Sequence, residues 1–282
     1  MPDPIGWHPH PDVWALIAVL GGGYAIALRR WGPRHVSPGD PPATPSQVGA
    51  FVAGLAVLWV AADWPVHELA EERLLSVHMV QHLLISLVAP PLLLAGTPGW
   101  MLRSLLRPPW LRAAVKNLAR PLPALLLFNG FIAFSHWPVI VDLAVRSEVA
   151  HFALHATLMG TALLMWMPVL SPIAEIRRLR YPAQMLYLFA QSIVPTVPAS
   201  FLTFADGPIY AFYGLASPLI GVDPVVDQRI AGLIMKLVGG FILWGFIAVL
   251  FFRWHAEDER TGSDAPPWQD VEREINRAGV AT

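Results

Sequence analysis

Long apolar runs separated by short polar segments make up most of this 282-residue chain. A helix that crosses the roughly 30 Å hydrocarbon core of a bilayer needs about 20 mostly apolar residues. Seven runs come close to this length, and each is expected to form a transmembrane helix. They lie at about 12–29, 47–62, 74–96, 122–140, 149–170, 182–204 and 229–252. The pattern predicts an all-α polytopic membrane protein, with a seven-helix transmembrane domain over 1–254 and a charged cytoplasmic tail over 255–282.

Positively charged side chains alternate between the two sets of connecting segments. Fifteen of the 19 Lys and Arg residues follow the first, third, fifth and seventh runs. The other loops hold Arg73, Arg146 and Arg229, and Lys236 lies within the seventh run. Because cytoplasmic loops of membrane proteins are enriched in Lys and Arg, we expect the N-terminus outside and the C-terminus in the cytoplasm.

Composition supports the membrane assignment and limits the chemistry. The chain is 55% hydrophobic and 14% charged, whereas soluble domains carry about 25% charged residues. Its net charge of −1 gives no sign of nucleic-acid binding, and the absence of cysteine excludes disulfides and thiolate metal sites. No carboxylate lies in the interior of a predicted span, so an enzyme with an intramembrane acid or base is not expected.

Two of the predicted helices each carry a pair of histidines four residues apart. His78 and His82 occupy the first two turns of the third run, and His151 and His155 those of the fifth. Residues four apart share one face of a helix, and both runs enter from the predicted outer side. With a rise of about 1.5 Å per residue, both pairs lie within roughly 10 Å of that interface. We therefore expect the four imidazoles to form one metal site.

Methionines and a further histidine extend this set of candidate ligands. Met79 follows His78, Met159 lies four residues after His155, and His67 belongs to the outer loop before the third helix. Imidazole and thioether ligands without thiolates or intramembrane carboxylates favour copper over magnesium, calcium or structural zinc. Neither histidine pair forms the HExxH motif of zinc proteases, so we predict metal binding without catalysis.

Other polar side chains are candidates to orient these ligands from behind. They are Asp63, Gln81, His136 and Asp227. Asp227 has an alternative role, since it opens the seventh run and could cap that helix.

Two alternatives to a copper-binding protein of this kind remain open. One histidine from each helix could hold a haem between them. A copper transporter would need polar groups that continue to the inner face, where the sequence offers Gln191, Ser192 and Lys236 beyond Met159.

Three motifs in order resemble one known family. They are SVHMVQHLLISLVAPPLLLAGTP from Ser76, HFALHATLMGTALLMWMPVLSP from His151 and DQRIAGLIMKLVGG from Asp227. They are similar to segments of the membrane-integral cytochrome c oxidase assembly factors of the CtaG type.

The resemblance implies a seven-helix, non-enzymatic protein of the bacterial inner (plasma) membrane that helps to assemble haem–copper oxidases. It also implies a role in copper supply, a terminal oxidase subunit as partner, and a site that includes Met79 and both histidine pairs. Whether the protein forms a homo-oligomer is left open.

Overall fold

The computed structural model describes residues 9–263 and 273, and every regular element within them is a helix. Six of these helices are long and apolar enough to cross a membrane, and a seventh crossing results if a pair bent by 82° counts as one. The crossings are Pro11–Arg34, Pro45–Ala62, Leu75–Gly96, Glu148–Leu170, Tyr181–Phe204, Pro224–Arg260, and the bent pair Pro109–Leu118 with Pro121–Ser135. The prediction of an all-α, multi-pass membrane protein is confirmed, whereas the side on which each terminus lies stays a prediction.

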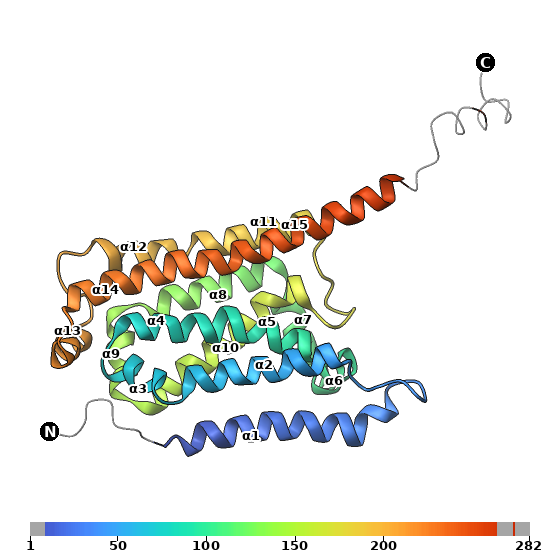
Figure 1. The fold of residues 1–282 in the computed structure, drawn as a ribbon, viewed down its shortest axis with the longest axis horizontal. Coiled ribbons are helices and arrows are strands. Elements are labelled where there is room, and N and C mark those ends of the chain that lie inside the picture. Colours follow the sequence, from blue (N-terminus) through green and yellow to red (C-terminus); the bar gives the residue numbers. More distant parts are fainter. Residues whose placement is uncertain (1–8, 264–272, 274–282) are drawn as a thin grey trace.

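The long helices run side by side, with short helices at both ends of the bundle (Figure 1). In chain order the elements are α1 (Pro11–Ile26), η1 (Ala27–Trp31), η2 (Gly32–Arg34), α2 (Pro45–Ala62), α3 (Val66–Glu72), α4 (Leu75–Leu83), η3 (Leu84–Val88), α5 (Ala89–Gly96), α6 (Gly99–Leu105), α7 (Pro109–Leu118), α8 (Pro121–Ser135), α9 (Pro138–Arg146), α10 (Glu148–Leu170), α11 (Tyr181–Ile193), α12 (Thr196–Phe204), α13 (Ala211–Ala216), η4 (Ser217–Ile220), α14 (Pro224–Leu233), η5 (Ile234–Val238) and α15 (Gly239–Ser263). Here η1, η3 and η5 are π-helical turns within longer helices. The predicted tail begins within α15, and 264–272 and 274–282 lie outside the described residues.

Prolines divide two of the predicted spans. The run expected at 122–140 ends its helix at Ser135, and a separate helix, α9, begins at Pro138. In the sixth span, α11 and α12 are separated at Pro195. Proline lacks the N–H that continues a helix, and its ring clashes with the preceding turn. The 15 residues of α8 span only about 22 Å, so this crossing is shorter than expected.

The helix pair α2 and α5 packs closely because glycines line the contact. A Cβ atom at Gly96 would lie 2.4 Å from the backbone nitrogen of Phe51, and one at Gly54 would lie 2.9 Å from the Leu93 side chain. The carbonyl of Gly96 also accepts a 2.9 Å hydrogen bond from the Tyr24 hydroxyl. The crossing formed by α4, η3 and α5 is therefore fastened to α1 and α2 at the end opposite its histidines.

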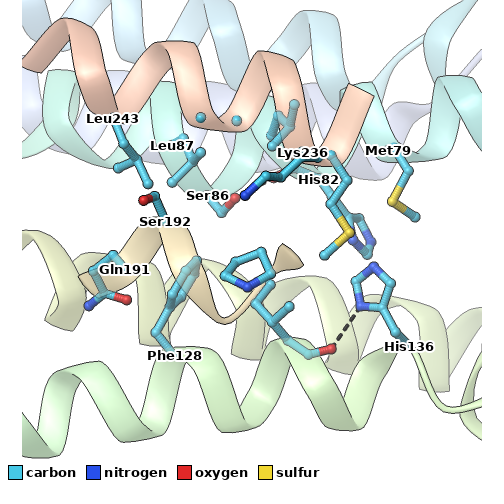
Figure 2. A pocket seen from close by; sticks show the side chains of 16 residues that line it. Met79, His82, Ser86, Leu87, Phe128, His136, Gln191, Ser192, Lys236 and Leu243 are labelled. Atoms are coloured by element: carbon cyan, nitrogen blue, oxygen red, sulfur yellow. Dashed lines mark hydrogen bonds between the residues drawn. The ribbon is translucent and has the colours of Figure 1, made fainter. Parts of the chain in front are cut away.

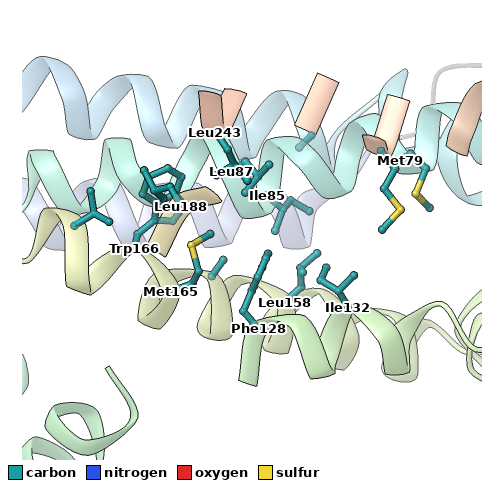
Figure 3. Close-up of a cluster of buried hydrophobic side chains, with 14 of the residues drawn as sticks. Met79, Ile85, Leu87, Phe128, Ile132, Leu158, Met165, Trp166, Leu188 and Leu243 are labelled. Carbon is teal, nitrogen blue, oxygen red and sulfur yellow. The ribbon is translucent and has the colours of Figure 1, made fainter. Parts of the chain in front are cut away.

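An apolar core lies between this crossing and the helices α8, α10, α11 and α15. Figure 3 shows Met165, Trp166 and Leu188 packed among them, with Phe128 nearby. Trp166 is fully buried and its Nε1 donates a 3.1 Å hydrogen bond to the carbonyl of Ser86 in η3. The two crossings that carry the histidine pairs are thus held against each other directly.

Short helices lie at the end of the bundle where the histidine-bearing helices begin. Figure 1 shows α3, α9 and α13 together at this end. The hydroxyl of Tyr213 in α13 donates a 2.7 Å hydrogen bond to the carbonyl of Ala70 in α3. The segment treated as an outer loop from the sequence therefore contains a helix, α3, that is held beside the first turns of α4.

Candidate metal centre

The structure brings the four paired histidines together. The rings of His78 and His82 on α4 have centroids 4.2 Å apart, and those of His151 and His155 on α10 are 4.1 Å apart. Between the helices, the rings of His82 and His155 are 5.2 Å apart. Four-residue spacing puts each pair on one helical face, and the contact between α4 and α10 turns the two faces toward each other.

Capping groups fix where each of the two helices begins. The Asp227 carboxylate accepts hydrogen bonds from the backbone N–H groups of Leu75 at 2.7 Å and Ser76 at 3.2 Å, in the first turn of α4. The Ser147 hydroxyl accepts a 3.3 Å bond from the N–H of Ala150 in the first turn of α10. Such caps satisfy N–H groups that a helix leaves unpaired, and here they set the depth of both histidine pairs.

Three imidazoles from the two helices form a group that we call the inner triad: His78, His82 and His155. One ligand atom from each lies within 4.8 Å of the other two. Nδ1 of His78, Nδ1 of His82 and Nε2 of His155 are buried and have no hydrogen-bond partner within the described chain. Buried polar atoms are nearly always paired, so an unpaired nitrogen on each of three neighbouring imidazoles is typical of a ligand site.

A second group, the outer triad, consists of Glu71, His151 and His155, with ligand atoms also within 4.8 Å of one another. Oε1 of Glu71 lies 2.6 Å from Nε2 of His151, and this nitrogen lies 3.1 Å from Nδ1 of His155. The same carboxylate oxygen is 2.8 Å from Nδ1 of His67, which is four residues earlier on α3. His155 belongs to both triads.

Glu71 and His67 lie outside the membrane-crossing helices, and each affects the pKa of the other. Burial acts to raise the pKa of Glu71, but the imidazoles of His151 and His67 outweigh it and hold that pKa well below its usual value. Burial acts to lower the pKa of His67, and the nearby carboxylates, chiefly Glu71 and then Glu68 and Asp12, reverse this and raise it. Glu71 is therefore an anion at neutral pH and a possible partner for a cation.

His136 and Met79 lie on the other side of the inner triad. Figure 2 shows the rings of His82 and His136 close together at one end of a cavity that Met79 also lines. Nδ1 of His136 contacts the carbonyl of Ile132 at 2.7 Å, while its Nε2 is buried without a partner in the described chain. The cavity continues toward Gln191 and Ser192.

The remaining predicted ligands face a cleft beside the outer triad. His67 and Met159 both line it, together with His151 and His155. The ring of His67 lies 6.1 Å from that of His151. Met159 also packs against the apolar core.

Three residues expected to support the ligands instead hold helices together. Asp63 accepts bonds from the indole N–H groups of Trp14 at 2.8 Å and Trp59 at 2.5 Å, because it ends α2 beside α1. Gln81 points away from the histidines and donates a 2.8 Å bond to the carbonyl of Ala61. Asp227 caps α4, as described above, and the cap of its own helix, α14, is Asp223.

The sequence reasoning missed Glu71 as a site residue, and also His10 and Tyr213. Nε2 of His10 lies 2.9 Å from Oε1 of Glu68, and its ring is 4.7 Å from that of His67. The ring of Tyr213 is 6.1 Å from that of His78. For Glu71 a signal existed, since it follows His67 by four residues. For Tyr213 none did, because its contacts depend on how α13 folds back. His8 lies outside the described residues.

The family of the chain follows from residues 22–257, which match the family model of the cytochrome c oxidase caa3 assembly factor, Caa3_CtaG. No curated protein and no solved structure matches the chain significantly. The matched region includes both triads and the helices that carry them. The resemblance of the three motifs is thereby confirmed, and the chain belongs to the caa3-type cytochrome c oxidase assembly factor family.

Proposed function

We propose that this protein binds a copper ion as cargo at the inner triad and supplies it to a cytochrome c oxidase subunit during assembly. The observation that carries the proposal is the set of three buried, unpaired imidazole nitrogens from α4 and α10. The family describes oxidase assembly, and copper is a metal that a haem–copper oxidase must receive. The protein would act without catalysing a reaction of its own.

The chemistry of the ligands supports copper as the cargo. Imidazole suits copper, and a thioether is among the soft ligands that select Cu(I). Met79, adjacent to His78 in sequence and lining the same cavity as His82, is a predicted thioether ligand. The chain has no cysteine, so a closed thiolate site is excluded. A three-imidazole site leaves a coordination position open, through which a ligand of the oxidase subunit could take over the ion.

The distribution of charge supports delivery at the outer face of a bacterial plasma membrane. The histidine end of the bundle lies at the predicted outer side, away from most Lys and Arg residues. In this arrangement the ion passes between two membrane proteins without crossing the bilayer.

Two features argue against the alternatives. A bis-histidine haem needs a flat porphyrin between two facing imidazoles, whereas here a third imidazole lies within 4.8 Å of both ligand atoms. A transporter would lead the cation along the cavity beyond His82, but this cavity is mainly apolar, and Lys236 is among the residues that line it. An apolar path gives a cation few ligands to replace its water shell.

The proposal is tested by the copper content of detergent-purified protein after competition with a copper(I) chelator. Wild type is expected to retain about one ion, and the His78→Ala/His82→Ala variant to lose it. A His35→Ala/His255→Ala variant is the control, because both of its histidines lie far from the triads along the chain. Equal retention in wild type and the triad variant would disprove the site, and a strong Soret band would replace copper with haem. In cells that lack the native gene, the triad variant should also fail to restore copper-loaded oxidase.

A further inference from the structure

A wide acidic cleft leads to the outer triad. It has a volume of about 540 Å³ and lies between α1, α2, α3 and α10. Five carboxylates line it: Asp12, Glu68, Glu71, Glu72 and Glu148. No Lys or Arg is among the described residues that line it. A concave surface with an excess of one charge sign raises the local concentration of counter-ions, and the carboxylates here outnumber the imidazoles His10 and His67 that pair with two of them, so cations should gather in this cleft.

Buried and unpaired imidazoles lie at the inner limit of this cleft. The His151 side chain is 7% exposed, and its Nδ1 has no hydrogen-bond partner in the described chain. Its other nitrogen, Nε2, lies 2.6 Å from Oε1 of Glu71 and 3.1 Å from Nδ1 of His155. One carboxylate oxygen and two imidazole nitrogens therefore meet where the cleft reaches α10.

We propose that Glu71, His151 and His155 form a second metal site, through which a copper ion enters and from which it is passed to the inner triad. This inference rests on the proposed function, because the ion that enters is the one that the inner triad holds. The acidic cleft collects the ion, the outer triad binds it first, and the inner triad binds it last.

His155 is the residue that connects the two sites. Its Nδ1 lies beside His151, whereas its Nε2 is buried and unpaired. Its ring is 5.2 Å from that of His82 and 6.0 Å from that of His78. For the transfer, the bonds from the ion to Glu71, His151 and Nδ1 of His155 break, and the ion forms new bonds to His78, His82 and Nε2 of His155, so that His155 binds it before and after the exchange through different nitrogens. The transfer involves only ligand exchange and no electron transfer.

The types of ligand give the transfer its direction. Carboxylate oxygen suits hard cations, whereas imidazole suits copper better. Exchange of the single carboxylate for another imidazole therefore favours the inner triad. Ligand exchange in the reverse direction is correspondingly unfavourable, which prevents the ion from returning to the cleft.

The outer site is tested in the His78→Ala/His82→Ala background, where only the outer triad remains. Titration with copper(II) chloride, without a chelator, should show one bound ion whose electron paramagnetic resonance spectrum carries splitting from two nitrogens. Addition of Glu71→Gln should raise its Kd at least tenfold. The matched control is Glu72→Gln, since Glu72 lines the same cleft but pairs with Arg73 at 3.6 Å; it should change the Kd by less than twofold.

The passage of copper is tested in the otherwise unchanged protein, where the inner triad is complete. Glu71→Gln should slow copper(I) uptake at least fivefold without changing the amount of copper finally retained, and Glu72→Gln should slow it less than twofold. Elution as a single species in size-exclusion chromatography, with an unchanged melting temperature, verifies that each variant is folded.

The outcomes separate this inference from the proposed function. If wild type retains copper but the background variant shows no two-nitrogen signal, or Glu71→Gln leaves its Kd and the uptake rate unchanged, the outer site is disproved and the inner triad stands. If wild type itself retains no copper against the chelator, the proposed function is disproved as well.

Discussion

The two halves of α10 differ in whether their buried polar atoms have hydrogen-bond partners. In the second half, Nε1 of Trp166 donates to the carbonyl of Ser86 at 3.1 Å. In the first half, Nδ1 of His151 and Nε2 of His155 are buried without a partner in the described chain. An unpaired buried polar group costs about 1–3 kcal/mol. The second half therefore stabilises the bundle, whereas the first half lowers its stability and leaves nitrogens free for a ligand.

The crossing that packs against α10, formed by α4, η3 and α5, shows the same contrast. His78 and His82 in α4 face the first half of α10, and Ser86 in η3 is paired with the second half. One pair of neighbouring crossings thus provides both a fixed scaffold and an incomplete site. Four substitutions test this difference, and they follow in order of expected effect.

Trp166→Ala, in the second half of α10, should have the largest effect on stability. It removes a fully buried indole, and such substitutions cost about 3–5 kcal/mol. We expect a clear fall in the melting temperature in detergent. Trp110→Ala is the control, since the Trp110 side chain is 73% exposed and should matter little. Equal losses in the two variants would mean that the buried contact does not stabilise the bundle.

His82→Phe should act in the opposite direction on the metal-free protein. The change replaces an imidazole that has a buried, unpaired Nδ1 with an apolar ring, so stability should rise by about 1–2 kcal/mol. Chelator-resistant copper should be lost at the same time. His35→Phe is the comparison, because Nδ1 of His35 already contacts the carbonyl of Trp31 at 2.8 Å. A less stable His82→Phe protein would contradict the free-energy cost that we assign to the unpaired histidine nitrogen.

Asp227→Ala should cause a smaller loss of stability and should also lower copper affinity. It removes the cap from the first turn of α4, and loss of a cap costs about 0.5–2 kcal/mol. Because His78 lies one turn further on, copper affinity should fall by a few-fold. Asp223→Ala removes the cap of α14 and should lower stability alone. Competition titrations together with melting curves separate the two effects, and equal copper affinity in both variants would contradict the linkage.

Met79→Leu should have the smallest effect. Met79 lines the cavity on the far side of His82, so the three imidazoles are expected to supply most of the binding. We predict a rise in the Kd for copper(I) of less than tenfold, which is below 1.4 kcal/mol. Chelator competition measures this shift. A rise of a hundredfold would make the thioether a principal ligand and change the assigned donor set.

The fold was largely predictable because each crossing is a local pattern. The apolar runs located the spans, including the sixth, in which the helix breaks at Pro195. One error lay in a local signal that was not used: the run at 122–140 stays largely apolar past Ser135, yet its helix ends there and Pro138 begins another. The polar segment 63–73 gave no apolar signal for α3. Contacts with residues distant in the sequence hold this helix beside the bundle.

The candidate site was predictable only in part. Spacing identified His78 with His82 and His151 with His155 as two helical faces. The four-residue spacing also pairs Glu71 with His67, but no local signal pairs Glu71 with His151, which is 80 residues away. The sequence also suggested that Asp227 caps its own helix or orients a histidine, whereas its carboxylate caps α4.

The sequence by itself determined which segments enter the membrane and which side chains share a helical face, because both depend on residues close together in the chain. Only the tertiary structure decided which faces meet, that His155 is common to two groups of candidate ligands, and that Glu71 lies in one of them. Those features depend on contacts between distant segments, and hydrophobic periodicity does not encode how one crossing is rotated against another.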